Sequence, residues 1–323
     1  MKKSICLFII IIFISACTPS SNLESSQNTI EKGVSLSPRS YSSEDFTSFF
    51  AKAQETGTII SWAGDWNELQ NVESGAPAVV MVLAETYSYT PIIEVQFFQQ
   101  SEQKLLRPLN EDNLQSYKEL TKEFVKKYNP PYLGIGIEVN ILYESSSEDF
   151  EIYASFYNQL YDEIKEISPE TKVFPIFQLE RMKGLKGGLF GGENNEKNNE
   201  WDLLTKFPKA DAIGFTSYPG LIYSEPTEIP EDYYLEIKNY TNKPIFFTEV
   251  GWPASLDIEG WQSSEEEQAA FVERIFLLIK DTNTEFIIWS FLYDQETEEP
   301  FKSLGLIDKE GNEKLAFETW KSS

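Results

Sequence analysis

Histidine is absent from the 323-residue sequence, and cysteine occurs only twice, as Cys6 and Cys17. The lack of histidine excludes the usual serine and cysteine catalytic triads, histidine metal sites and histidine general bases. Both cysteines lie within or at the end of an apolar leader, so the rest of the chain can form neither a disulfide nor a zinc–thiolate site. Acid–base chemistry near neutral pH must therefore depend on carboxylates, tyrosine or lysine.

Basic residues are also scarce. The sequence has 27 Lys and Arg against 52 Asp and Glu, which gives a formal net charge of −25. Such a surface repels polyanions, so we expect no nucleic-acid partner. It favours solubility and does not repel uncharged polymers such as glycans. We interpret the acidity as the solvated surface of an exported protein and not as a cation-binding site.

No apolar run reaches the roughly 20 residues that a membrane-spanning helix needs. The run from Ile5 to Ile14 follows two lysines and ends at small residues, which is the layout of a secretory signal. Its ending, "ISAC", resembles the bacterial lipobox, and this resemblance implies that Cys17 is lipidated. The alternative is an ordinary cleaved signal in which Cys17 has no role.

This layout predicts three parts. We expect a signal peptide over residues 1–16, a polar tether over 17–32 that begins at the lipidated Cys17, and one folded domain over 33–323. The protein would be exported and lipid-anchored to a membrane on its extracytoplasmic face. We expect a monomer that touches the membrane only through this anchor.

Eight short runs rich in β-branched and aromatic residues are each followed by a segment with helical periodicity. They cover residues 33–37, 58–63, 91–98, 132–138, 172–178, 211–218, 244–249 and 285–291. Most are apolar at consecutive positions, which is typical of parallel strands covered on both faces. The apolar segment 75–89 is assigned to a helix because Pro77 suits a helix start. Eight alternations predict a single (β/α)8 TIM barrel, with a doubly wound open sheet as the alternative.

Two glutamates stand at predicted strand ends, Glu138 as the last residue of the fourth strand and Glu249 as the last residue of the seventh. In a barrel of this kind the active site forms at the carboxyl ends of the strands. Two carboxylates there can divide the work of glycoside hydrolysis, one as proton donor and one as nucleophile or base. This chemistry requires no cofactor and no metal. A single glutamate at such a place can equally be a salt-bridge partner at the rim.

Several segments resemble the retaining (β/α)8 glycoside hydrolases whose catalytic glutamates lie on strands 4 and 7, and among them most nearly the arabinogalactan endo-β-1,4-galactanase family. The segments are "GIEVN" at 136–140, "DAIGFTSYP" at 211–219, "PIFFTEVGWP" at 244–253, "IIWSFLYD" at 287–294 and "GLIDKEGNEKLAFETW" at 305–320. The resemblance implies that Glu138 is the acid/base and Glu249 the nucleophile. It also implies that Tyr218 donates a hydrogen bond to the nucleophile and that Trp289 forms a sugar platform.

One position departs from the resemblance. Ile137 stands where the clan has an asparagine that contacts the 2-hydroxyl of the sugar, so a hydrogen bond that strengthens in the transition state is missing. Asn140 is the candidate replacement if the chain turns back there. Further candidate sugar contacts follow the second and seventh strands. They are Trp62, Asp65 and Trp252, for which packing is the competing interpretation.

The leading hypothesis is an exported glycoside hydrolase that cleaves a β-linked polysaccharide or oligosaccharide with retention of configuration. The first alternative is a non-catalytic glycan-binding lipoprotein with a glycosidase-like barrel, for which Ile137 is the main support. The second is a solute-binding lipoprotein of a transporter. That class needs two lobes and a hinge, and the sequence contains no linker that would divide the domain.

Overall fold

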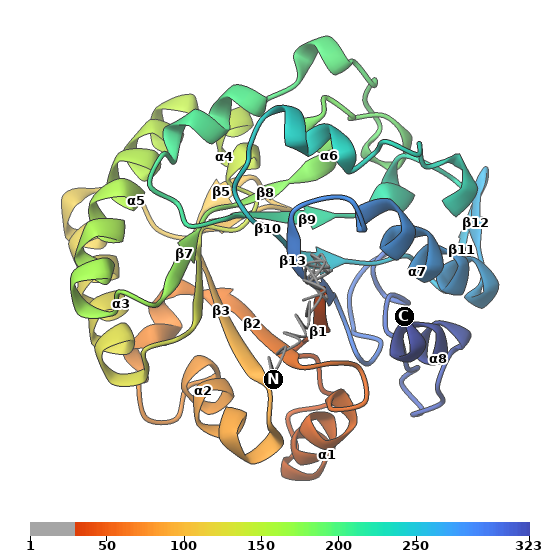
Figure 1. Ribbon diagram of the computed structural model, residues 1–323, viewed down its shortest axis with the longest axis horizontal. Helices are drawn as coiled ribbons and strands as arrows, with labels where there is room; N and C mark the ends of the chain where they lie inside the picture. Colours follow the sequence, from red (N-terminus) through yellow and green to blue (C-terminus); the bar gives the residue numbers. More distant parts are fainter. Residues whose placement is uncertain (1–29) are drawn as a thin grey trace, which may run out of the picture.

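The computed structural model describes residues 30–323, so the predicted signal peptide, Cys17 and all but the end of the predicted tether lie outside the described residues. Within them, parallel strands surround a central axis and helices form an outer layer (Figure 1). None of the helices in the described part of the chain is both long and apolar enough to cross a membrane.

One sheet of nine parallel strands forms the centre of the molecule. The strands are β1 (Glu31–Ser35), β2 (Ile59–Asp65), β3 (Thr90–Gln96), β6 (Tyr132–Ile135), β7 (Lys172–Phe174), β8 (Ile176–Gln178), β9 (Ile213–Ser217), β10 (Ile245–Val250) and β13 (Thr284–Trp289). Two short hairpins lie outside this sheet. They pair β4 (Phe98–Gln99) with β5 (Lys104–Leu105), and β11 (Leu256–Ile258) with β12 (Trp261–Ser263).

The strand order β7-β6-β3-β2-β1-β13-β10-β9-β8 begins and ends with two halves of the single strand predicted over 172–178. Pro175 separates the halves because it has no backbone N–H to donate. Its carbonyl accepts a hydrogen bond from Gly214 at 2.9 Å, and the N–H of Ile176 reaches the carbonyl of Gly136 at 3.1 Å. The sheet therefore closes on itself. The predicted (β/α)8 barrel is confirmed, and the open-sheet alternative is wrong.

Within residues 30–323, eight α-helices cover much of the barrel. They are α1 (Ser43–Ala53), α2 (Ala76–Tyr87), α3 (Glu111–Tyr128), α4 (Val139–Ser145), α5 (Ser147–Ile167), α6 (Leu179–Met182), α7 (Glu265–Ile279) and α8 (Leu315–Ser322). The assignment of residues 75–89 to a helix is confirmed by α2, which has a proline in its first turn. Helices α3 and α5 contact each other on one side of the barrel, and α7 contacts α8 on another (Figure 1).

The crossovers after the fifth and sixth strands are less regular than the sequence predicts. They consist mainly of 3-10 helices, which belong to a set of seven in the described residues. The set is η1 (Trp66–Gln70), η2 (Gly188–Phe190), η3 (Glu196–Asn198), η4 (Trp201–Lys206), η5 (Pro219–Leu221), η6 (Pro226–Glu228) and η7 (Leu235–Asn239).

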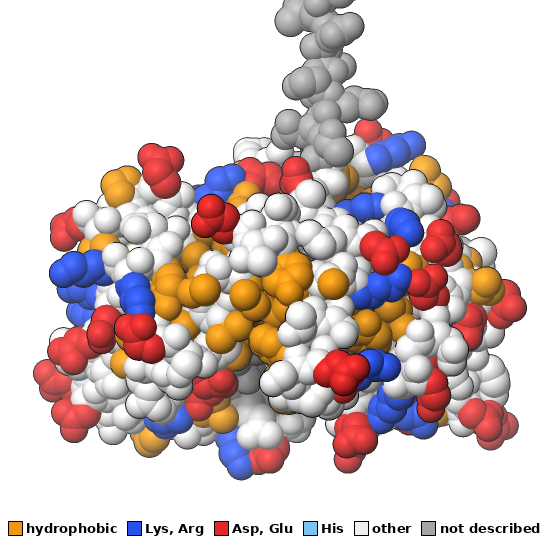
Figure 2. All heavy atoms as spheres, turned by 90° about the horizontal axis from the view of Figure 1, so that it is seen from below, with side chains coloured by type: hydrophobic (Ala, Val, Ile, Leu, Met, Phe, Trp, Pro, Cys, Tyr) orange, Lys and Arg blue, Asp and Glu red, His pale blue; other side chains and the backbone are white. Residues whose placement is uncertain are grey.

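The strands bury side chains on both faces, which forms two apolar layers. The inner layer fills the barrel and includes Ile59, Ile92, Phe246 and Ile288, whereas the outer layer lies between the sheet and the helices. Charged side chains remain on the surface. Figure 2 shows acidic side chains spread around the face it presents, with basic ones between them and hydrophobic ones gathered toward its middle. The excess negative charge is therefore distributed on that face and forms no single patch.

Candidate active site

A pocket of about 250 Å³ lies at the carboxyl ends of the strands, where a barrel fold places ligands. Six of its ten lining residues form two groups. The first, which we call the carboxylate wall, consists of Glu138, Tyr218 and Glu249. The second, the aromatic wall, consists of Phe291, Thr297 and Phe301. A larger groove of about 610 Å³ lies elsewhere, between α3 and α5 on the outer surface of the barrel.

Glu138 reaches the pocket through an unusual turn of the backbone. Strand β6 ends at Ile135, and Gly136 and Glu138 then adopt left-handed conformations with φ of +86° and +53°. For a residue other than glycine this region costs about 1–2 kcal/mol. The turn breaks the alternation of the strand, so the side chains of Ile137 and Glu138 both line the pocket.

The Glu138 carboxylate accepts a hydrogen bond of 2.6 Å from the hydroxyl of Thr216 on β9. Burial raises the pKa of Glu138 to about 7, the negative charge of Glu249 adds to the rise, and the Thr216 hydroxyl opposes it. A carboxyl group with such a pKa can hold a proton near neutral pH and then release it. These are the properties of a general acid/base.

Glu249 lies at a bulge in strand β10. The pairing of β10 with β9 shifts register between Phe247 and Glu249. Phe246 belongs to the inner layer and Phe247 to the outer layer, so an unbroken alternation would turn residue 249 outward. The bulge instead directs Glu249 into the pocket, as bulges beside active sites commonly do.

Tyr218 holds the Glu249 carboxylate in place. Its hydroxyl donates to Glu249 at 2.7 Å, as the resemblance implies, and lies 2.8 Å from the hydroxyl of Ser290. Burial and the charge of Glu249 raise the pKa of Tyr218 well above its usual value, so the phenol stays a donor. Burial also raises the pKa of Glu249, and the Tyr218 hydrogen bond opposes that rise.

The two glutamates are close neighbours in the barrel. Thr216, which binds Glu138, is the direct register partner of Glu249 on the adjacent strand, and adjacent strands lie about 4.8 Å apart. Neither carboxylate forms an ion pair with any described residue. The pKa of Glu138 responds to the charge of Glu249, which is the relation expected when Glu249 ionises first.

A third carboxyl group, Glu94, lies below the pocket. It is on the inner face of β3 between Ile92 of the inner layer and Gln96 at the pocket, and only 1% of it is exposed. Neither of its carboxyl oxygens forms a hydrogen bond of normal geometry with any described residue. Burial and the charge of Glu249 raise the pKa of Glu94 well above its usual value, so we expect this group to be neutral.

Three tryptophans predicted to contact sugar do not reach the pocket. Trp289 is fully buried, donates to the Leu304 carbonyl at 2.7 Å and packs against Trp320 of α8. Trp252 packs against Phe271 of α7, and Trp62 belongs to the outer layer. The predictions that these rings stack on a sugar are wrong because all three face the helices and not the barrel mouth.

Asn140 and Asp65 are also engaged elsewhere. The Asn140 amide lies fully buried in α4, where it accepts from the backbone N–H of Gln178 at 2.9 Å and donates to the carbonyl of the same residue at 3.1 Å. Asp65 forms two hydrogen bonds of 2.8 Å with Arg107 and caps η1 by accepting from Asn67. The predictions that Asn140 replaces the missing asparagine and that Asp65 binds sugar are therefore wrong for this structure.

Two glutamines are the amide groups that the pocket does contain. Gln96 ends β3, and Gln100 lies in the turn of the β4–β5 hairpin. The Gln100 amide donates to the Ile137 carbonyl at 3.0 Å, so an amide side chain does lie beside position 137. The rule that identified Glu138 and Glu249, a polar residue at the end of an apolar strand, would also have identified Gln96.

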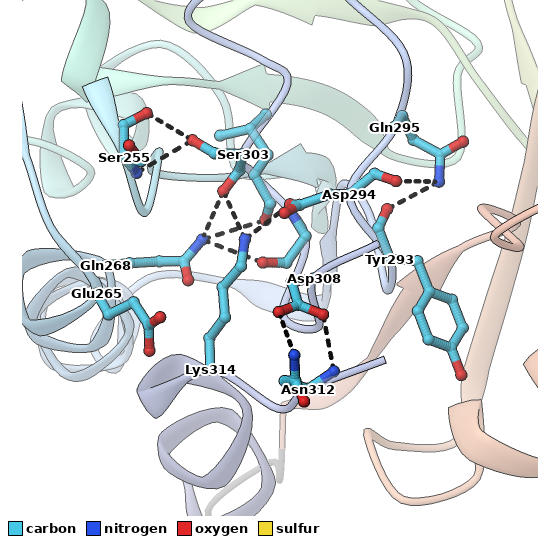
Figure 3. Close-up of polar contacts among 12 residues, drawn as sticks. Ser255, Glu265, Gln268, Tyr293, Asp294, Gln295, Ser303, Asp308, Asn312 and Lys314 are labelled. Atoms are coloured by element: carbon cyan, nitrogen blue, oxygen red, sulfur yellow. Dashed lines mark hydrogen bonds and ion pairs between the residues drawn. The ribbon is translucent and has the colours of Figure 1, made fainter. Parts of the chain in front are cut away.

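The aromatic wall belongs to the long segment 290–314 that follows β13. A buried ion pair of 2.7 Å between Asp294 and Lys314 joins the two arms of this segment, and Lys314 also donates to the carbonyl of Ser303 at 3.0 Å (Figure 3). Ser303 donates to the carbonyl of Ser255 at 2.8 Å, which ties the segment to the loop after β10. These contacts hold the aromatic wall in position.

No group of three or more potential metal ligands occurs among residues 30–323. Comparison with known proteins finds no matching family model and no matching curated protein. The chain does match many solved structures.

An exo-β-1,4-mannosidase from Opitutaceae bacterium strain TAV5 matches with a TM-score of 0.66 at 14% identity, over 91% of this chain and 58% of that chain. A GH2 β-galacturonidase from Eisenbergiella tayi matches with a TM-score of 0.61 at 17% identity, over 91% of this chain and 50% of that chain. A family 39 glycoside hydrolase from Bacteroides cellulosilyticus WH2 matches with a TM-score of 0.62 at 15% identity, over 92% of this chain and 63% of that chain.

The chain thus spans 50% to 63% of the length of these three proteins. At such low identities the likeness shows the fold alone. That fold is the barrel found in glycoside hydrolases, and the matches do not single out the arabinogalactan endo-β-1,4-galactanase family.

Proposed function

We propose that the protein is a retaining glycoside hydrolase that cleaves a β-linked glycan by double displacement. One observation carries the proposal: two glutamates that pair with no cation in the described part of the chain line the same pocket at the barrel mouth, in environments that differ in the way the two roles require. The fold, shared with glycoside hydrolases of several kinds, supports the same conclusion.

In the first step a Glu249 oxygen attacks the anomeric carbon, the glycosidic C–O bond breaks, and the leaving oxygen takes the proton of Glu138. The Tyr218 hydroxyl keeps the attacking carboxylate oriented. In the second step Glu138 removes a proton from water, which attacks the anomeric carbon and releases Glu249. Two inversions give net retention, and both carboxyl groups return to their starting states.

The resemblance of the strand-end segments to endo-β-1,4-galactanases makes β-1,4-galactan the first polymer to test. We further propose, from the leader and "ISAC", that the enzyme is exported and anchored through a lipid on Cys17. An extracytoplasmic location would bring the pocket to glycans outside the cytoplasm.

The deciding experiment is mass spectrometry of the soluble domain after incubation with a panel of 2-deoxy-2-fluoro-glycosyl inactivators. The fluorine slows hydrolysis of the covalent intermediate, so we expect an adduct on a peptide containing Glu249. The Glu249→Gln variant serves as the matched control and should give none. A wild-type protein that forms no adduct and cleaves no glycan across a broad panel would contradict the proposal.

That outcome would favour the second candidate, a glycan-binding protein without turnover. The observation behind it is Ile137, whose side chain lines the pocket where the resemblance leads one to expect an amide. The Gln100 amide beside it argues for catalysis. Loss of activity in Gln100→Leu, with the pocket still binding ligand, would assign the missing role to Gln100.

A further inference from the structure

The pocket combines neutral hydrogen-bonding groups with apolar surface and negative charge. Gln96, Gln100 and Thr297 offer amide and hydroxyl groups, which both donate and accept hydrogen bonds as sugar hydroxyls do. Ile137 and the rings of the aromatic wall supply the apolar surface. None of the residues between 30 and 323 that line the pocket is a lysine or an arginine.

Three cations around this region are already paired, and the first of them, Lys302 next to Phe301, forms an ion pair with Glu299. Arg181, whose charge acts on the pKa of Glu138, forms an ion pair of 2.5 Å with Glu144 and lies over the ring of Phe190. Lys186 pairs with the same Glu144 at 2.9 Å and with Glu200 at 3.3 Å. A ligand carboxylate would have to compete with these carboxylates for a counter-ion.

A negatively charged sugar would therefore meet two costs in this pocket. Its carboxylate would lose water beside Ile137 and the aromatic wall without gaining a cation, and burial of an unpaired charge is strongly unfavourable. It would also be repelled by ionised Glu249 at short range, in a site where water screens charges poorly. An uncharged sugar meets neither cost.

On the basis of the proposed function, we propose that the sugar bound next to Glu249 is uncharged, a neutral hexose or pentose unit, and that uronic acids are rejected by charge. The inference sets the substrate class of the site. It concerns binding, so it can be tested whether or not the protein turns its ligand over.

The test is ligand-observed NMR binding with the soluble domain and hydrolysis-resistant phenyl 1-thio-β-glycosides in matched pairs. Glucoside is compared with glucuronide, galactoside with galacturonide, and xyloside is added as a neutral pentoside. We expect the neutral member of at least one pair to bind at least about 100-fold more tightly at low salt. The preference should shrink at 0.5 M salt, because salt screens charge repulsion but not a steric clash.

A charge variant sharpens the test. Thr297 lies exposed at the pocket rim, so Thr297→Arg would bring a cation to the pocket and is expected to improve uronide binding about 10-fold relative to the neutral partner. Thr297→Gln, of similar length without charge, should leave the ratio unchanged.

Equal or tighter binding of the uronides to the wild type would overturn the inference, and so would no binding of any neutral glycoside. Hydrolysis of the corresponding O-linked phenyl glycosides, measured separately, tests the proposed function. Neutral binding without hydrolysis would overturn the catalytic proposal alone, whereas hydrolysis of uronides alone would overturn the inference alone.

Discussion

The carboxylate wall and the aromatic wall line the same pocket, but different parts of the chain hold them in place. Glu138 lies just beyond β6 and accepts a hydrogen bond from Thr216 on β9, and Glu249 lies on β10 and accepts one from Tyr218 just beyond the adjacent strand β9. Phe291 and Phe301 depend on a long segment whose arms are joined by side-chain contacts such as the Asp294–Lys314 ion pair. The position of a side chain at a strand end can be predicted from the sequence pattern of the strand. The position of a side chain on a long irregular segment cannot.

The largest effect is expected in the carboxylate wall. Glu249→Gln should lower kcat/KM at least about 10⁴-fold on every substrate, because the variant lacks the nucleophile. Glu138→Gln should lose about 10²–10⁴-fold on glycosides with poor leaving groups and much less on 2,4-dinitrophenyl glycosides, which need no proton donor. Steady-state kinetics with both substrate types measures this. The exposed Glu298→Gln is the control, and equal losses for both variants on both substrates would contradict the assigned roles.

The next effect separates packing from binding. Trp289→Ala should reduce the free energy of unfolding by about 3–5 kcal/mol, because it leaves a cavity between β13 and the helices. The melting temperature should fall by about 6–20 °C, measured by calorimetry. The KM of the folded variant should stay unchanged. A raised KM without loss of stability would restore the sugar-platform role predicted from the sequence.

Phe301→Ala should show the reverse pattern. Removal of an apolar face of the pocket should raise KM about 10-fold, with a melting temperature within about 2 °C of the wild type. Tyr240→Ala, an exposed aromatic residue outside the pocket, is the control. The rings of Phe301 and Tyr218 also pack edge-on, with their centroids 5.3 Å apart. A fall in kcat with unchanged KM would therefore mean that the Phe301 ring positions Tyr218 instead of binding sugar.

A smaller effect concerns the acid/base alone. Glu138 must be protonated to donate, so kcat/KM should fall as the pH rises through about 7. The Thr216 hydroxyl stabilises the ionised carboxylate, and its removal in Thr216→Val should raise the pKa of Glu138. The basic limb of the pH profile should then move upward by up to about one unit. Thr216→Ser keeps the hydroxyl and should retain the basic limb of the wild-type pH profile. A shift of this limb to lower pH in Thr216→Val would contradict the assignment of Glu138 as the acid/base.

The smallest expected effect concerns Glu94, which lies below both walls of the pocket. Because burial raises the pKa of Glu94, wild-type stability from this group is fully present below its unfolded pKa near 4.5 and is lost as the pH rises toward the folded value. Glu94→Gln cannot ionise, so it should melt about 3 °C or more above the wild type at pH 8 and at nearly the same temperature at pH 4. A stability difference that does not depend on pH would show that Glu94 is not buried in its neutral form.

The eight strands and the carboxylate wall were accessible from the sequence because apolar runs ending in a polar residue are a local signal. The orientation of the Trp62 and Trp289 rings could not be predicted from the sequence. Strands of a parallel barrel are apolar on both faces, so the sequence does not reveal which face holds a given ring, and both rings belong to the outer layer.

The break at Pro175 and the bulge at Glu249 were also missed as local features, although the strands containing them were predicted. Phe301 and Thr297 had no local signal, because contacts with residues far along the chain hold their segment.

The left-handed backbone of Glu138 bears on how this protein could evolve. At φ +53° glycine or asparagine would be the less strained choice, and either would also remove a buried carboxyl group. A lineage released from the need to cleave glycans would therefore gain stability by losing this glutamate. Under the proposed function, selection for catalysis opposes that drift and retains Glu138.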